Sequence, residues 1–158
     1  MTKSVEIEGI STEHIALRDQ IISTLPAETV IPIFIAICGS QAKGLASPTS
    51  DFDMKMIVLH SKTYYLLQKS TASTRLKTEY NSIEVEGTIM DALPATTNYL
   101  PKSNPMIYEC MAGIPIYKTV YSEKLNQLWQ KSYNWEIIRH ATLGILTGYK
   151  HKKLFLDK

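Results

Sequence analysis

Two apolar segments with a Gly-Ser turn between them constrain this chain more than any other feature. Residues 31–37 form an apolar run, Gly39 and Ser40 follow almost at once, and residues 54–59 form a second apolar run after a polar loop. This order predicts a strand, a tight turn, a short helix, a loop and a second strand. We expect both strands to lie in the core of the protein.

Two aspartates, Asp51 and Asp53, stand at the start of the second predicted strand. Because side chains alternate between the faces of a strand, we expect the two aspartates to share one face and Phe52 and Met54 to point into the opposite layer. Two carboxylates this close repel each other unless a divalent cation lies between them. Mg²⁺ fits such a site, since it accepts one or two carboxylates and keeps positions for water and substrate phosphates, and Mn²⁺ accepts the same oxygen ligands.

These residues carry a family resemblance. Gly39-Ser40 followed by Asp51-x-Asp53 resembles the signature of the DNA polymerase beta-like nucleotidyltransferase superfamily. The longer pattern, Gly-Ser-x-Ala-x-Gly and then Ser-Asp-x-Asp, is similar to the YcgL-like branch of predicted nucleotidyltransferases, one member of which accompanies RNA-ligase repair systems. Residues 104–109 resemble a second block of that branch, and residues 139–144 resemble a third more weakly. The resemblance spans residues 31–150.

The resemblance implies a metal-dependent nucleotidyltransferase. Such an enzyme transfers a nucleoside monophosphate from a nucleoside triphosphate, here expected to be ATP, to a hydroxyl acceptor, here expected to be an RNA end. Asp51 and Asp53 would be catalytic metal ligands. A third carboxylate is expected on a neighbouring strand, where Glu84 and Glu86 share a face. Alignment on the second block favours Glu86 and leaves Glu84 as the alternate.

Four residues are expected to bind the nucleotide. Gly39 lets the backbone approach a phosphate closely, and the short helix after it offers free N–H groups. The Ser40 hydroxyl can donate a hydrogen bond to the triphosphate. Lys43 can meet a phosphate as a point charge, although it is equally expected as a solvated helix residue. Ser50 is expected to hydrogen-bond the loop that carries the aspartates.

Other polar residues are weaker candidates. Asn104 belongs to the second block, but Asn-Pro also starts ordinary helices, and Glu109 is expected near the first turn of that helix, where it would compensate the helix dipole. We expect Arg139 and His140 to lie on a helix surface and not to contact a phosphate. The basic residues of 150–153 favour a solvated tail over a nucleic-acid contact.

Composition places the chain among ordinary globular proteins. The 158 residues are 44% hydrophobic and 20% charged, which predicts one compact unit with a core. The net charge of +2 does not by itself predict nucleic-acid binding. Cys38 and Cys110 are expected to be reduced thiols in a cytoplasmic protein, because the sequence shows neither a signal segment nor a membrane span.

The periodicity predicts an α+β fold, and the resemblance implies that this fold is of the polymerase beta palm type. It has a small mixed sheet flanked by helices on one side and a helical C-terminal part. Residues 1–118 would form the catalytic core, and residues 119–158 a C-terminal helical extension, shorter than in the related branch, within the same compact unit. The expected strands are 29–38, 52–60 and 80–90, with an extended piece at 114–117. The expected helices are 12–25, 40–45, 63–69, 91–100, 106–111, 123–133 and 135–149, with a flexible polar connection at 70–77.

Two other functions fit the same residues. The first is transfer of AMP to a partner protein, as the minimal nucleotidyltransferase antitoxins do, which the small size and weak net charge favour. The second is a non-catalytic module that keeps the fold and binds nucleotide or metal. The glutamate in the third carboxylate position and the short C-terminal part leave room for this alternative.

Overall fold

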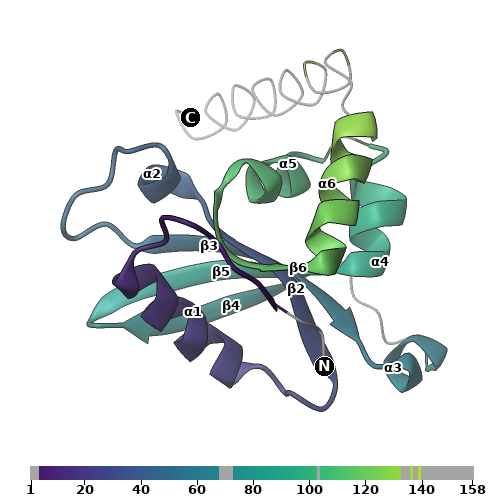
Figure 1. Ribbon diagram of the computed structural model, residues 1–158, viewed down its shortest axis with the longest axis horizontal. Helices are drawn as coiled ribbons and strands as arrows, with labels where there is room; N and C mark the ends of the chain where they lie inside the picture. Colours follow the sequence, from purple (N-terminus) through teal and green to yellow (C-terminus); the bar gives the residue numbers. More distant parts are fainter. Residues whose placement is uncertain (1–3, 68–72, 103, 133–135, 137–138, 140–158) are drawn as a thin grey trace, which may run out of the picture.

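The computed structural model describes residues 4–67, 73–102, 104–132, 136 and 139. Six strands form one mixed sheet in the order β1-β6-β2-β3-β5-β4 (Figure 1). The β3–β5 pair is parallel, and the other neighbours are antiparallel. The strands are β1 (Ser4–Val5), β2 (Val30–Ile37), β3 (Phe52–His60), β4 (Ser73–Tyr80), β5 (Ile83–Asp91) and β6 (Ile114–Thr119). The helices are α1 (Thr12–Thr24), α2 (Gly39–Ala42), α3 (Lys62–Leu66), α4 (Ala92–Pro94), the π-helix η1 (Ala95–Tyr99), α5 (Pro105–Ala112) and α6 (Val120–Ser132).

The predicted α+β class and mixed sheet are confirmed, but helices cover both faces of the sheet and not one. On one face, Leu17 and Ile21 of α1 pack against the alternate residues of β3. On the other face, α4, η1, α5 and α6 cover a second apolar cluster (Figure 1). The physical reason lies in β2, where every residue of 33–37 is buried, because a strand that is apolar on both faces needs cover on both sides.

Pro32 marks the entrance of a central strand and not the edge of the sheet. Strand β2 pairs with β3 on one side and with β6 on the other. Pairing with β6 begins only at Phe34, and the β2–β3 register shifts between Pro32 and Phe34. The missing N–H of the proline therefore falls where the ladder is irregular. The shift also lets both Ile33 and Phe34 enter the same core cluster.

The segment predicted as a flexible polar connection contains an edge strand. Strand β4 pairs with β5 along its whole length, and a two-residue turn joins them. Asn81 and Ser82 have φ angles of 50° and 65° in this turn, as expected for a tight hairpin whose central residues are both left-handed. The prediction failed because an edge strand with one solvated face has few apolar residues. Only Leu76 and Tyr80 of β4 pack against the core cluster.

Side chains cap the starts of several helices. The Ser11 hydroxyl accepts a hydrogen bond from the His14 N–H at 3.1 Å, and the Asp91 carboxylate accepts one from the Leu93 N–H at 2.9 Å. Side-chain caps of this kind satisfy N–H groups that the first turn of a helix leaves free. No helix among the described residues is long and apolar enough to cross a membrane.

The C-terminal part starts differently from the prediction. Helix α6 begins at Val120, so Ser122 lies inside its first turn and does not cap it. The Ser122 hydroxyl accepts a hydrogen bond from the Thr119 N–H and donates one to the Ile33 carbonyl, each at 2.8 Å. Most of the helix predicted at 135–149 lies outside the described residues. The predicted boundary at residue 118 falls inside β6, and the division into a core and an extension stays a prediction.

We expect Ser122→Ala to lower the free energy of unfolding by about 1–3 kcal/mol, because it removes a buried hydroxyl that bridges β2 and α6. Chemical denaturation followed by circular dichroism measures the change. Ser73→Ala, at the exposed start of β4, is the matched control and should change stability by less than about 0.5 kcal/mol. Equal effects of the two substitutions would contradict a bridging role for Ser122.

Candidate active site

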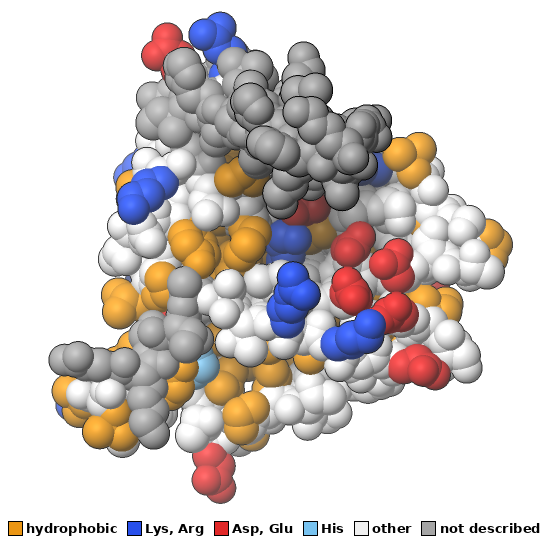
Figure 2. All heavy atoms as spheres, turned by 180° about the vertical axis from the view of Figure 1, so that it is seen from behind, with side chains coloured by type: hydrophobic (Ala, Val, Ile, Leu, Met, Phe, Trp, Pro, Cys, Tyr) orange, Lys and Arg blue, Asp and Glu red, His pale blue; other side chains and the backbone are white. Residues whose placement is uncertain are grey.

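The two aspartates lie where the sequence predicts them, at the start of β3. Phe52 and Met54 are 3% and 2% exposed and belong to the cluster on the α1 face, so Asp53 faces the opposite layer. Asp51 directly precedes the strand and is exposed. Figure 2 shows acidic side chains gathered on one part of the surface, with Lys and Arg side chains beside them. This concentration of charge marks the candidate site.

The parallel pairing of β3 and β5 brings a third carboxylate beside Asp53. Asp53 and Glu86 are direct partners in the register, and both line a cavity of about 390 Å³. Glu84 does not line that cavity. Lys77 of β4 forms ion pairs with both glutamates, with its Nζ 3.5 Å from a carboxylate oxygen of Glu86. Of the two glutamates, the structure therefore places Glu86 nearer to Asp53.

The carboxylates strain one another. Burial raises the pKa of Asp53, and the charges of Asp51, Glu109 and Glu86 raise it further, while Lys55 lowers it. Such an arrangement costs free energy when all the groups are ionised. A divalent cation between them would relieve that cost and would accept the same oxygen atoms as ligands.

The donor set fits a divalent cation in its chemistry. Among the described residues, no three potential ligand side chains already converge on one point. Asp53 lies on β3 and Asp51 directly precedes it, whereas Glu86 on β5 is paired with Lys77. The Lys77 and Glu86 side chains are both exposed, so solvent screens this ion pair. Asp51, Asp53 and Glu86 carry the oxygen atoms that Mg²⁺ and Mn²⁺ prefer as ligands, and metal binding by these residues stays a prediction.

Gly39 packs directly on Asp53. Its φ is +62°, a left-handed conformation that other residues rarely adopt. A Cβ at this position would lie 1.9 Å from the Asp53 Oδ2 atom, so no larger side chain fits. The Cys38 N–H donates to the Asp53 carbonyl at 2.7 Å and fixes the turn against β3. The first half of the motif is thus a structural requirement of the second half.

The other predicted nucleotide-binding residues follow Gly39 in the sequence, in α2 and in the loop before Asp51. Ser40 is the second residue of α2, which is only one turn long, and Lys43 is exposed at its end. The Ser50 hydroxyl accepts a hydrogen bond from the Ser47 N–H at 2.8 Å, within the loop that precedes Asp51. A nucleotide contact of these residues stays a prediction.

Lys55 is a site residue that the sequence analysis missed. It follows Asp53 by two residues on the same face of β3, and its side chain is 13% exposed. Its Nζ lies 2.8 Å from Glu109 Oε2. Glu109 lies in the second turn of α5, so the expectation that it compensates the helix dipole in the first turn is wrong. The alternation of residues 51, 53 and 55 was the signal that could have identified Lys55.

The remaining candidates are not brought into this site. Asn104 caps α5, since its side chain accepts a hydrogen bond from the Met106 N–H at 2.9 Å. Arg139 is exposed, and His140 and residues 150–153 lie outside the described residues. Cys38 and Cys110 are buried free thiols, and burial raises the pKa of Cys38 to about 11, so a reactive thiolate is not favoured.

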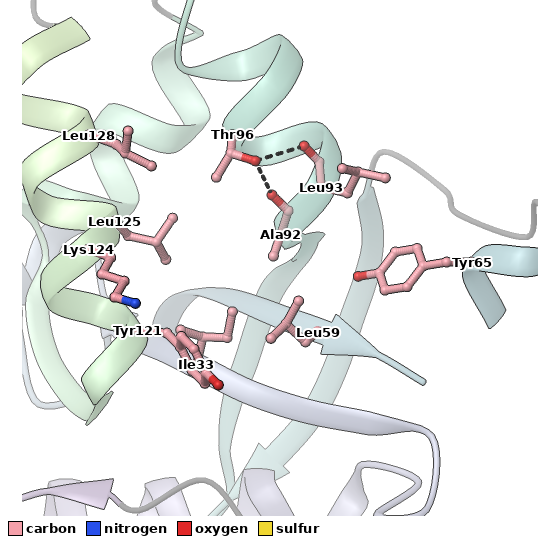
Figure 3. Close-up of a pocket in the computed structure, with 10 residues that line it drawn as sticks. All are labelled: Ile33, Leu59, Tyr65, Ala92, Leu93, Thr96, Tyr121, Lys124, Leu125 and Leu128. Atoms are coloured by element: carbon pink, nitrogen blue, oxygen red, sulfur yellow. Dashed lines mark hydrogen bonds between the residues drawn. The ribbon is translucent and has the colours of Figure 1, made fainter. Parts of the chain in front are cut away.

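A larger cavity, of about 560 Å³, lies at the other end of β3, between α4 and α6 (Figure 3). Aliphatic side chains dominate its lining, and Lys124 is the one charged residue among its described lining residues. The Thr96 hydroxyl is engaged with the Ala92 and Leu93 carbonyls. With no carboxylate in its lining, this cavity lacks the chemistry of the site at Asp53.

The match to a known family agrees with the motif. A family model described as the RNA repair pathway DNA polymerase beta family matches residues 16–152. A crystal structure of a nucleotidyltransferase-like protein from Exiguobacterium sibiricum 255-15 is similar over 79% of this chain, at 14% identity and a TM-score of 0.46. The chain spans 39% of that protein's chain. No curated protein matches the sequence.

We expect Asp53→Asn to raise the free energy of unfolding at pH 7 by about 1 kcal/mol or less, because the amide removes like-charge repulsion. Folding raises the pKa of Asp53 above its usual value of 3.8. Between the unfolded and the folded pKa, the folded state therefore binds more protons than the unfolded state, and the stability of the wild type falls as pH rises through this range. The advantage of the variant should therefore shrink as pH falls toward 3.8.

Urea denaturation at several pH values measures this difference. Asp19→Asn is the control, because it removes an exposed carboxylate that pairs with Arg18 and should bring no gain. Mg²⁺ should raise the melting temperature of the wild type but not that of Asp53→Asn. A variant less stable than the wild type at pH 7 would show that Asp53 is not held against repulsion.

We expect Gly39→Ala to lower stability by more than Gly44→Ala. Both glycines have left-handed φ angles, +62° and +67°, but an added Cβ at Gly44 meets nothing within 4 Å. Gly44→Ala should cost about 1–2 kcal/mol for the backbone alone, whereas Gly39→Ala should also displace Asp53. Thermal denaturation with and without Mg²⁺ tests this, and retention of a full Mg²⁺ shift in Gly39→Ala would refute the contact.

Proposed function

The chain belongs to the RNA repair pathway DNA polymerase beta family, and on that premise we propose that it is a metal-dependent nucleotidyltransferase acting on RNA ends. The donor would be a nucleoside triphosphate, with ATP as the first candidate. Mg²⁺ or Mn²⁺ would be the cofactor. The acceptor would be a hydroxyl group at the end of an RNA strand.

One observation carries this proposal. Asp53 lies between Gly39, which contacts it from the end of β2, and Glu86, its register partner on β5. The Gly-Ser turn, the Asp51-x-Asp53 segment and the carboxylate of Glu86 are therefore close together, and we assign them to phosphate binding and metal binding. Nucleotidyl transfer needs these three parts together, since its catalysis consists mainly of positioning and charge neutralisation.

The residues divide the work by their position. The N–H groups of Gly39 and Ser40 would bind the triphosphate, because these residues open α2 and a glycine allows close approach. Asp51, Asp53 and Glu86 would hold the divalent cation, which would neutralise the charge that develops on the phosphate oxygens. Lys55, which is half-buried and pairs with the exposed Glu109, would keep a positive charge beside Asp53.

In the proposed step, the oxygen of the acceptor hydroxyl forms a bond to the α-phosphorus. The bond between the α-phosphorus and the oxygen that bridges to the β-phosphorus breaks. Pyrophosphate leaves with that electron pair, and the hydroxyl proton passes to solvent. Glu86, which lies on β5 on the other side of β3 from β2, would orient the acceptor.

We expect the protein to transfer α-labelled nucleotide to a mixture of RNA ends in the presence of Mg²⁺ or Mn²⁺. Asp51→Ala and Asp53→Ala should reduce the transfer at least 100-fold, since each removes a metal ligand. Glu86→Gln should do the same, and Glu84→Gln is its matched control on the same strand. Gel analysis of labelled RNA and labelled protein measures the transfer.

The same gels separate the alternatives. Label in a partner protein and not in RNA would replace the RNA acceptor with protein AMPylation. Metal-dependent nucleotide binding without any transfer would favour the non-catalytic module. Equal loss in Glu84→Gln and Glu86→Gln would contradict the assignment of Glu86 as the third carboxylate.

A further inference from the structure

The face that carries the carboxylates continues across β5 onto the edge strand β4. Register pairs place Lys77 beside Glu86 and Arg75 beside Thr88. Neighbouring partners in a sheet point to the same face, so both cations share the face of Asp53. All of these residues line the cavity of about 390 Å³. The sheet thus presents a row of acidic groups followed by a row of basic groups at its edge.

The cations around the carboxylates differ in what they already bind. Lys55 pairs with Glu109, and Lys77 pairs with Glu84 and Glu86. Arg75 is exposed and makes no ion pair or side-chain hydrogen bond with any residue that the structure describes. Of these three cations, the Arg75 guanidinium is therefore the one available to bind an anion from outside the protein. A guanidinium binds phosphate through two parallel N–H bonds.

The position of Arg75 separates it from the proposed triphosphate site. Strand β2, which leads to Gly39, lies on one side of β3, and β5 and β4 lie on the other. From β3 to β4 is two strand spacings, about 10 Å. A group bound at Arg75 is thus on the far side of Asp53 from the turn at Gly39. This is the side from which an acceptor must approach if the donor triphosphate fills the turn.

We propose that the exposed edge of β4 is the acceptor side of the site, where Arg75 binds a backbone phosphate of the RNA strand that presents its hydroxyl at Asp53. This inference rests on the proposed function and names the residue that recognises the acceptor. An RNA strand fits better than a protein acceptor because each of its nucleotides carries a phosphate, and a guanidinium binds one such phosphate. An open sheet edge also leaves space for a long chain to pass.

The test measures RNA binding apart from catalysis. Fluorescence anisotropy of a short 5′-labelled single-stranded RNA would be followed with the full chain between about 50 and 200 mM salt. Arg75→Ala should bind about tenfold more weakly, and the slope of log affinity against log salt should fall by about 0.7. The RNA affinity of Arg75→Lys should lie between those of the wild type and Arg75→Ala, because lysine keeps the charge but lacks the planar guanidinium.

Two controls make the result specific. Lys62→Ala removes an exposed cation at the opposite end of β3 and should leave RNA affinity unchanged. Binding of ATP with Mg²⁺, measured by calorimetry, should be the same in Arg75→Ala and the wild type. Wild-type RNA affinity and salt slope in Arg75→Ala would overturn the inference. Loss of ATP affinity in place of RNA affinity would also overturn it, because it would move Arg75 to the donor side.

Failure of the proposed function would look different. A wild type that binds RNA through Arg75 but transfers no nucleotide would refute the activity and support this surface as an RNA site. A wild type that labels a protein and shows no Arg75-dependent RNA binding would refute the acceptor assignment while the transferase chemistry stands.

Discussion

The parallel register of β3 and β5 is the constraint on which the candidate site depends. It sets Asp53 opposite Glu86, although β4 and α3 intervene in the sequence. Parallel strands cannot be joined by a tight turn, so the chain must leave the sheet after β3 and return. In this protein the return passes through the edge strand β4, which forms a hairpin with β5. The crossover that creates the carboxylate pair therefore also brings basic residues beside it.

This arrangement has a cost in stability that the rest of the fold offsets. Burial and three neighbouring carboxylates disfavour the charge of Asp53. Asp53 keeps its partly exposed position because apolar clusters on both faces of the sheet hold β3 in place. Lys55 and Lys77 reduce the repulsion from two sides. Sites that bind a metal or a charged substrate commonly hold such strain until the ligand arrives.

The local part of the site could be predicted from the sequence, and the part that depends on pairing could not. Asp51, Asp53 and Gly39 lie within one strand-turn-strand unit, so spacing and alternation were enough to place them. The choice of Glu86 over Glu84 needed the register with β3. The sequence did not identify Arg75, because the polar residues of β4 do not predict a strand. This segment becomes a strand through its pairing with β5.

The sequence by itself determined the local chemistry of the site, namely a glycine that permits a left-handed turn and two carboxylates two residues apart at the start of a strand. These features follow from backbone sterics and the two-residue period of a strand, which act over short distances along the chain. Only the tertiary structure decided which glutamate joins Asp53, that Lys55 pairs with Glu109, and that a basic edge flanks the carboxylates. Those relations depend on strand order and packing, because both bring together residues that no local spacing connects.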